Sequence, residues 1–290
     1  MAGGPGWELC ERVKGSLSYP INEIKDELEN ADLAIISNES SFVEGCSQGA
    51  GTTSFCGKPT YIQNLLDMGI DVVSLTGNHM NDYGRDYFTD TLDLYTENEI
   101  QYFASGKNST EAWEPLIVQT DAGTIAFMGI NRMGPDGVLA TDSLAGTAYY
   151  VQETFLEKLD EVKDNVDIVW LDTHLWPEYG TTPTQEQVTI TQTAIENGVD
   201  IVTGVSSHEP LRMTFYKGKP IFYGLGNFLF DQMWSEETRL GMVPKIHIYN
   251  GKIVNIEILP TRLYDYCQPR FLEDEDRTSV LEYFVGISEL

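Results

Sequence analysis

The stretch "GIDVVSLTGNHMNDYG", residues 69–84, runs from an apolar segment directly into a cluster of polar side chains. Residues 70–77 form a short apolar run, which predicts a buried β-strand. Asn78, His79 and Asp82 follow within a few positions, where this strand ends. In open α/β sheets, binding sites are built at the carboxyl ends of the strands. We therefore expect a functional site at this strand end.

Three further apolar runs also end in polar residues, namely "DLAIIS" (32–37), "VDIVWLDTH" (166–174) and "VDIVTG" (199–204). Segments with helical periodicity alternate with these runs, at 58–69, 85–99, 152–164 and 182–198. Paired strand-like runs predict hairpins at 115–130, 211–226 and 242–260, and the chain ends in a predicted short helix, 277–290. This order predicts an α/β protein with one mixed sheet or two sheets, and no linker or internal repeat indicates a second domain.

The composition is typical of a globular protein, with 41% apolar and 22% charged residues among 290. The formal net charge of −27 argues strongly against nucleic acid as a partner, because a polyanion repels a polyanion. The charge also disfavours anionic membrane surfaces, and an anionic polymer would bind only through a local basic patch or a metal ion. No apolar run is long enough to span a bilayer.

The first residues, "MAGGPGWELCERVKG", lack the basic and apolar regions of a signal peptide, so residues 1–21 are expected to be a lead segment. The cysteines are Cys10, Cys46, Cys56 and Cys267, and no pair of them has the spacing of a zinc ribbon. Cys46 and Cys56 flank the Gly- and Ser-rich loop "CSQGAGTTSFC". We expect these two cysteines to form a disulfide if the protein is extracellular, or to be free buried thiols otherwise.

The polar residues after the four apolar runs are rich in side chains that bind metals. They are Asn38, Glu39, Asn78, His79, Asp172, His174, Glu178, Ser206, Ser207 and His208. Three of the four histidines are among them, although any one alone could be a hydrogen-bonded structural histidine. Imidazole, carboxylate and amide ligands suit Zn, Mn or Fe, and two such ions can generate hydroxide and clamp a phosphate. Because the residues come from separate strands, their spacing alone does not establish a metal site.

Two further features allow either a functional or a structural interpretation. Trp170, Trp176 and Tyr179 would form either an aromatic pocket wall or core packing. The run "GLGNFLFDQ" predicts a tight turn, in which Asn227 and Asp231 would either support the site or only pack.

Three segments together resemble one bacterial family. They are "FCGKPTYIQNLLDMGIDVVSLTGNHMNDYG", "THLWPEY" and "GVDIVTGVSSHEPLRMTFYKGKPIFYGLGNFLFDQ". From about residue 22 to about residue 270, the chain resembles the capsule synthesis family called CapA, or poly-γ-glutamate synthesis protein, a branch of the calcineurin-like metallophosphatases. The resemblance implies a four-layer α/β/β/α sandwich of two mixed sheets. It also implies a single domain over 1–290, with 1–21 as the lead segment and 261–290 as a C-terminal extension.

The resemblance implies roles for six residues. The implied metal ligands are Glu39, Asn78, His174 and His208, and the implied catalytic residues are His79 and Glu178. Two departures from the family pattern stand out. Ser206 lies in "GVSSH" where the family has a histidine, and no strand ending in Gly-Asp precedes residue 30, so the first strand of the fold would be lacking. Each implied position for Mn, Zn or Fe thus loses one ligand, and a complete two-metal centre is not expected.

The resemblance implies a CapA-like protein of capsule or poly-γ-glutamate biosynthesis with a degraded metallophosphatase-type site. Two alternatives are an active metal-dependent hydrolase of a phosphoester or polymer bond, and a non-catalytic component that binds the polymer or a partner. The expected partners are a cell-envelope polymer or components of its synthase. The expected location is the extracellular face of the bacterial cell membrane, with the membrane anchor absent from this chain.

Overall fold

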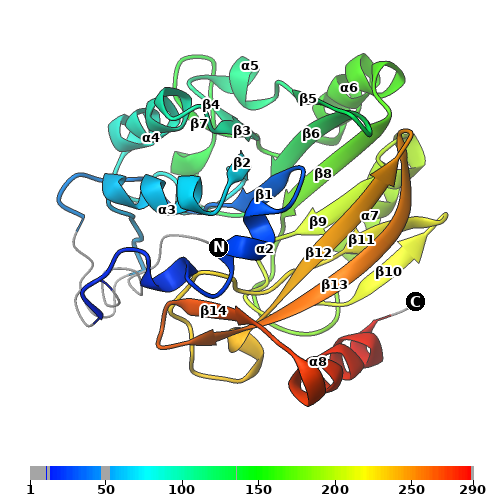
Figure 1. Ribbon diagram of the computed structural model, residues 1–290. Helices are drawn as coiled ribbons and strands as arrows, with labels where there is room; N and C mark the ends of the chain where they lie inside the picture. Colours follow the sequence, from blue (N-terminus) through cyan, green and yellow to red (C-terminus); the bar gives the residue numbers. More distant parts are fainter. Residues whose placement is uncertain (1–10, 12–13, 47–52, 135, 289–290) are drawn as a thin grey trace.

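The computed structural model describes residues 11, 14–46, 53–134 and 136–288 of the chain (Figure 1). Two β-sheets pack face to face, and helices cover the outer face of each sheet. The expected four-layer α/β/β/α arrangement is therefore confirmed, but only the six-stranded sheet is mixed, because β1-β2-β3 pair in parallel throughout. Among the described residues before Ala34 there are helical segments and no strand.

The first sheet consists of three parallel strands in the order β1-β2-β3, which are β1 (Ala34–Ser37), β2 (Ile70–Ser74) and β3 (Gln101–Phe103). The helices of its outer layer are α2 (Lys25–Glu29), α3 (Ile62–Asp67) and α4 (Arg85–Glu97). Buried side chains such as Leu65, Phe88 and Leu92 pack these helices onto the sheet. The predicted strand 70–77 thus ends at Ser74, and the predicted helix 58–69 begins with a 3₁₀ turn, Pro59–Tyr61.

The second sheet has six strands in the order β10-β11-β9-β8-β6-β5. They are β5 (Leu116–Thr120), β6 (Gly123–Asn131), β8 (Ile168–His174), β9 (Ile201–Gly204), β10 (Met213–Tyr216) and β11 (Lys219–Phe222). The four inner strands are parallel, and the two edge strands, β5 and β10, are antiparallel to their neighbours. Helices α6 (Gln152–Val162) and α7 (Gln185–Asn197) cover its outer face.

Helix α7 shows how the sequence sets an element boundary. The Thr184 hydroxyl accepts the Gln187 N–H at 3.2 Å, and the Gln187 side chain accepts the Thr184 N–H at 2.8 Å. This reciprocal capping box fixes the start of the helix. Gly198 ends the helix: its φ of 125° is a backbone conformation that residues other than glycine rarely adopt.

The apolar layer between the two sheets is formed by β-branched and aromatic residues. Val72 and Phe103 of the first sheet meet Phe127, Ile168 and Ile201 of the second. The carboxyl ends of β1, β2, β8 and β9 lie at the same edge of the sandwich, because β1 runs parallel to β2 and β8 to β9, and Glu39 after β1 lies next to His174 at the end of β8. That edge carries the candidate site.

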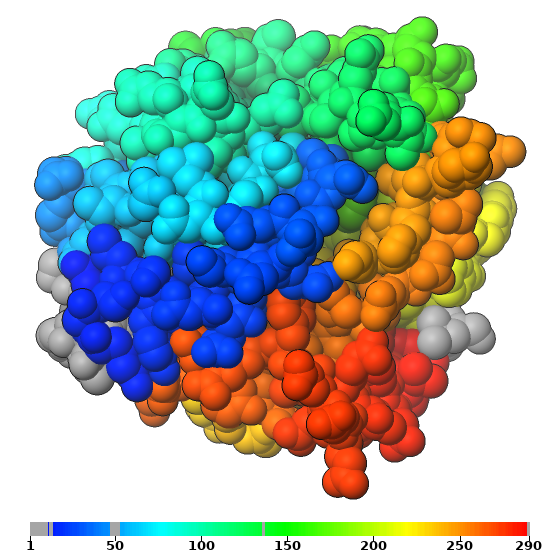
Figure 2. Space-filling view, viewed as in Figure 1, coloured from blue at the N-terminus to red at the C-terminus, as the bar shows by residue number. Residues whose placement is uncertain are grey.

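A third, antiparallel sheet follows in the order β12-β13-β14, with β12 (Leu240–Tyr249), β13 (Lys252–Tyr264) and β14 (Gln268–Phe271). Helix α8 (Asp274–Ile287) packs on it through Val280 and Phe284. Figure 2 shows the blue N-terminal residues lying against the orange and red C-terminal ones. Lys245 contacts Glu27 at 2.6 Å, and the Gln268 amide donates to the Tyr19 carbonyl at 2.7 Å.

The remaining elements are short. They are β4 (Ser105–Gly106), β7 (Gly146–Thr147), α5 (Ser109–Ala112) and the 3₁₀ turns Tyr19–Ile21, Asp136–Val138, Lys163–Asn165 and Glu237–Arg239. Among the described residues, none of the helices is both long enough and apolar enough to cross a membrane. Cys46 and Cys56 form a disulfide, with their Cα atoms 6.0 Å apart, which decides between the two expectations for this pair.

Candidate functional site

The polar residues that follow the strands of both sheets meet at one edge of the molecule. Ser40 pairs with His79 in an isolated β-bridge, which places the loop after β1 beside the loop after β2. His174 at the end of β8 lies next to Glu39, so the second sheet joins the same site. The sequence could indicate these strand ends one by one but not which of them touch.

Glu39 and His174 form a buried pair with unsatisfied polar atoms. His174 Nδ1 lies 3.6 Å from Glu39 Oε1, which is beyond hydrogen-bond distance. Within the described part of the chain, neither His174 nitrogen nor Glu39 Oε1 has a hydrogen-bond partner. Burial raises the pKa of Glu39 to about 7 and lowers the pKa of His174 to about 3. Unpaired buried groups of this kind are costly to a fold and suggest a missing binding partner.

The backbone around Glu39 is held closely in place. The Asn38 side-chain amide donates to the Ser40 carbonyl at 2.8 Å and to the Tyr95 hydroxyl at 2.7 Å. A Cβ added at Gly77 would lie 2.6 Å from Glu39 Cα, so only glycine allows the two loops to approach this closely.

Asp172 ties the two sheets together beneath the site. Its buried carboxylate accepts hydrogen bonds from the Ser74 hydroxyl of the first sheet and, at 2.6 Å, from the Thr203 hydroxyl of the second. Burial raises the pKa of Asp172 to about 6. Because its oxygens already have donors, Asp172 is a structural residue rather than an open ligand.

His79 is oriented by Asp82, a residue of the same segment whose role the sequence analysis did not identify. His79 Nδ1 lies 2.8 Å from Asp82 Oδ2, and the Phe55 N–H donates to the same oxygen at 2.8 Å. The Phe55 ring packs edge-on against the imidazole, with centroids 4.5 Å apart. Burial opposes protonation of His79, but the hydrogen bond and charge of Asp82 outweigh it and raise the pKa of His79 overall. The i, i+3 spacing of His79 and Asp82 was the available sequence signal.

His208 is oriented by Asn227. The Asn227 amide nitrogen donates to the Thr238 carbonyl at 2.9 Å, so its oxygen is the atom that faces His208 Nδ1 at 3.1 Å. Nδ1 therefore carries the proton, and Nε2 keeps its lone pair, 3.9 Å from Glu178 Oε1. Burial lowers the pKa of His208 to about 4 and raises the pKa of Glu178. A second hydrogen bond of this kind is typical of histidines that bind metals.

Ser206 does not take the place of the histidine that the resemblance implies at this position. Its buried hydroxyl donates to the Leu175 carbonyl and so serves the backbone. Asn78 is half-buried beside Gly134, whose φ of 91° and close approach leave no room for a side chain. Across residues 11, 14–46, 53–134 and 136–288, no three His, Cys, Asp or Glu side chains are grouped so as to hold a metal ion. The site thus consists of separate pairs, and the metal and catalytic roles stay predictions.

The aromatic residues named from the sequence divide into two groups. Trp170 belongs to the layer between the sheets, where its indole N–H donates to the Thr203 hydroxyl at 3.0 Å. Trp176 and Tyr179 are exposed beside the site. The Tyr179 ring stacks on the His208 imidazole with centroids 5.3 Å apart, and the Phe230 ring stacks on the same imidazole with centroids 5.5 Å apart. Core packing therefore explains Trp170, whereas Tyr179 borders the site.

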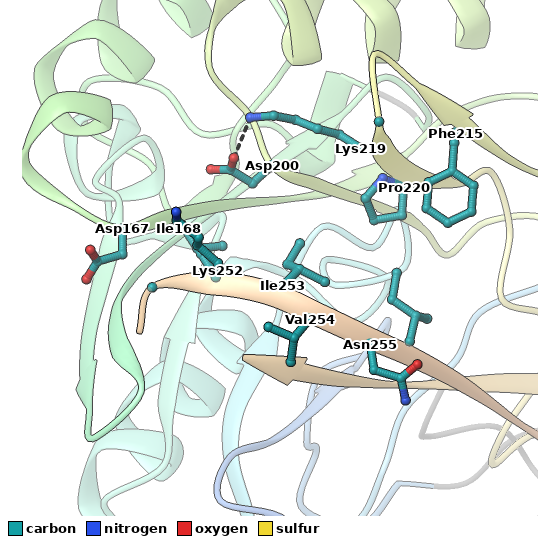
Figure 3. A pocket seen from close by; sticks show the side chains of 13 residues that line it. Asp167, Ile168, Asp200, Phe215, Lys219, Pro220, Lys252, Ile253, Val254 and Asn255 are labelled. Atoms are coloured by element: carbon teal, nitrogen blue, oxygen red, sulfur yellow. Dashed lines mark hydrogen bonds and ion pairs between the residues drawn. The ribbon is translucent and has the colours of Figure 1, made fainter. Parts of the chain in front are cut away.

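A separate hollow of about 530 Å³ lies at the other end of the parallel strands (Figure 3). Phe215, Lys219 and Val254 line it, and it opens beside Asp167 and Asp200, which precede β8 and β9. Asp200 pairs with Lys219, and Asp167 accepts the Thr124 N–H at 2.8 Å. Its acidic groups therefore already have partners within the described residues, unlike Glu39 Oε1 at the carboxyl-end site.

Comparison with known proteins agrees with the motifs of the sequence. The family model described as "Bacterial capsule synthesis protein PGA_cap" matches residues 1–232. The "Capsule biosynthesis protein CapA" of Bacillus anthracis is 26% identical over 212 residues, which are 72% of this chain and 51% of that protein. The "PGA biosynthesis protein CapA" of Bacillus subtilis is 29% identical over 207 residues, which are 70% of this chain and 54% of that protein. The chain thus spans about half the length of these two curated relatives.

A solved structure shares the fold at low identity. The crystal structure of a hypothetical protein from Thermus thermophilus matches with a TM-score of 0.51 and 16% identity, covering 81% of this chain and 90% of that one. This match bears on the fold alone, whereas the family model covers most of the sequence, including all the residues of the candidate site. The chain belongs to the bacterial capsule synthesis protein PGA_cap family.

Proposed function

We propose that this chain serves in the biosynthesis of a bacterial capsule or another cell-envelope polymer such as poly-γ-glutamate, as a metal-dependent hydrolase of the metallophosphatase type. The family and the names of the two Bacillus relatives support the pathway. The observation that carries the chemistry is the buried pair of Glu39 and His174, with three polar atoms that have no partner among the described residues. The bond cleaved would be a phosphoester or a bond of the polymer.

The donors at Glu39 and His174 fit a divalent ion. A carboxylate oxygen and the lone-pair nitrogen of a neutral imidazole, buried and unpaired, are ligands that Zn, Mn and Fe accept. Asn78 and His208 would add an amide oxygen and the Nε2 lone pair. A bound ion would supply a Lewis acid and lower the pKa of a bound water. Because the Ser206 hydroxyl serves a backbone carbonyl, these residues support one ion rather than two.

Side chains of the protein would transfer the proton that the leaving group needs. Asp82 holds His79 through Nδ1, which leaves Nε2 to face a substrate. A histidine held in this way can donate a proton to a leaving group. Glu178, beside His208 and half-buried, would accept or hold a proton on the other side.

A second candidate function is a non-catalytic component that binds the polymer or a partner with the same surface. The commitment of Ser206 to the backbone favours it, because one metal position then lacks a ligand. The separation of the site, within the described ranges, into pairs of residues also favours it.

The family and the disulfide support a cellular location outside the cytoplasm. Disulfides persist in oxidising compartments, so the Cys46–Cys56 bond supports a position outside the cytoplasm. We propose that the protein lies at the outer face of the cell membrane, where components of a polymer synthase would be its partners.

A hydrolysis assay tests the proposed activity. We expect purified protein with added Mn to cleave bis(p-nitrophenyl) phosphate, measured by release of p-nitrophenol. His79→Gln should lower the rate by about 100-fold or more, because general acid catalysis typically contributes that much. His247→Gln, a change of an exposed histidine on β12, should leave the rate unchanged. A wild-type rate no higher than that of His79→Gln would contradict hydrolysis and favour the binding role.

A further inference from the structure

An exposed aromatic pair lies beside His208. The Tyr179 ring stacks on the His208 imidazole at 5.3 Å and lies 6.2 Å from the Trp234 ring. Trp234 is 67% exposed and Tyr179 38%, and Trp176 in the same loop as Tyr179 is 60% exposed. Large aromatic faces that are gathered in water next to a site typically mark a place where a ligand binds.

The Tyr179 ring is held in place before any ligand arrives. Its backbone has a φ of 62°, a left-handed conformation that is costly for a bulky residue. The Tyr179 N–H donates to the Ser207 carbonyl at 2.9 Å, and its hydroxyl accepts from the Gln232 amide at 3.4 Å. These contacts, together with the stacking on His208, fix the ring's orientation, so a ligand would not have to order it.

Three segments beside this pair are acidic. Residues 174–180, 204–211 and 227–236 contain no lysine or arginine, and their carboxylates are Glu178, Glu209, Asp231 and Glu236. Glu236 is paired with Arg239, and Glu209 accepts the Gly180 N–H at 3.0 Å. The one ion-pair contact of Glu178 within the described residues is His208 at 3.9 Å.

Aromatic faces next to carboxylates favour one class of ligand. A cation gains from the negative face of each ring as well as from the carboxylates. We propose that Tyr179, Trp234 and Glu178 form a subsite for an alkylammonium group on the substrate, such as a primary amine of an envelope polymer. This inference rests on the proposed function in one respect, that the aromatic pair lies beside the proposed site, and it adds a class of ligand to that site. It does not require the site to hydrolyse anything. An anionic group would instead meet carboxylates in segments that lack lysine and arginine.

Calorimetric titration of the full chain, kept in chelator, tests the proposal apart from any metal chemistry. The probes are Nα-acetyl-lysine methylamide and its norleucine analogue, which has a similar side chain without the ammonium group. We expect the lysine probe to bind at least about 10-fold more tightly than the norleucine probe. Trp234→Ala should weaken lysine binding by about 3- to 10-fold, the usual range for one cation–π contact, and Trp234→Phe by less.

Tyr249→Ala is the matched control, because Tyr249 is also 67% exposed but lies at the far end of β12. Tyr249→Ala should leave the affinity for the lysine probe within about twofold of wild type. Non-specific attraction to a protein of charge −27 would instead leave every variant, Trp234→Ala included, within that range. Glu178→Gln should weaken the lysine probe and not the norleucine probe. Equal binding of the two probes, or equal effects of Trp234→Ala and Tyr249→Ala, would overturn the proposal. Tighter binding of methyl glucoside than of the lysine probe would also overturn it and assign the rings to a neutral sugar.

Discussion

Gly77 shows how a single residue can determine the shape of the site. It follows β2, and its missing side chain lets the loop after β2 approach Glu39. The nearest atom to an added methyl group would be Glu39 Cα at 2.6 Å, which belongs to the backbone and cannot rotate away. Any larger residue would therefore have to push the two loops apart.

We predict that Gly77→Ala lowers the free energy of unfolding by about 1–3 kcal/mol, the usual cost of overpacking. It should also weaken metal binding, because Glu39 moves. Urea denaturation and metal titration measure the two effects. Gly286→Ala is the control: the added Cβ meets nothing within 4 Å there, and alanine is a better helix former. If Gly77→Ala were as stable as Gly286→Ala, the close approach of the two loops would not constrain the site.

The sequence indicated individual site residues but not the hydrogen-bond partners that fix their orientation and protonation. His174 and His208 could be found because each follows an apolar run. Asn227 could be named as a possible supporting residue but not as the partner of His208, because it lies 19 residues further along the chain, in a turn whose contacts depend on the fold. Likewise, Ser206 could be recognised as a departure from the family, but its bond to the Leu175 carbonyl becomes visible only in the structure.

At the scale of elements, the disulfide loop supports the orientation of His79. Phe55 is the neighbour of Cys56, and it contacts both Asp82, through its N–H, and the His79 ring, through its side chain. The bond between Cys46 and Cys56 thus anchors the segment that holds Asp82 and His79 together.

We predict that replacing both Cys46 and Cys56 by serine lowers the free energy of unfolding by about 3 kcal/mol, as chain-entropy estimates give for a closed loop of this length. Thermal denaturation of wild type and variant measures this. The hydrolysis rate should also fall, because Asp82 loses a fixed donor. A hydrolysis rate that stays unchanged in the double variant would show that the loop does not position His79.

Strands and helices were more predictable than the ways in which they pair. The apolar runs at 32–37, 166–174 and 199–204 all contain strands, because β-branched residues favour buried sheet positions. Strand β14 was not predicted: its four residues, "QPRF", carry no alternating pattern and become a strand by pairing with residues 261–264 of β13. Tertiary pairing thus outweighed local preference in this segment.

For the whole molecule, the arrangement of layers could be predicted only from the resemblance to a family. Periodicity alone allowed one mixed sheet or two, and how two sheets face each other depends on packing between Val72, Phe103 and Phe127 rather than on local pattern. The same packing brings Glu39 of one sheet next to His174 of the other. The site is therefore a property of the folded sandwich as a whole.

Metal content tests the central claim, that the Glu39–His174 pair holds a divalent ion. We predict that chelator-treated wild type takes up about one Mn or Zn per chain in calorimetric titration, and that the affinity of His174→Ala is lower by at least about 10-fold, since loss of a supporting residue alone typically costs that much. His247→Ala, which removes an exposed histidine on β12, should bind as wild type does. Equal metal affinity of wild type and His174→Ala, or no uptake by either, would contradict the account.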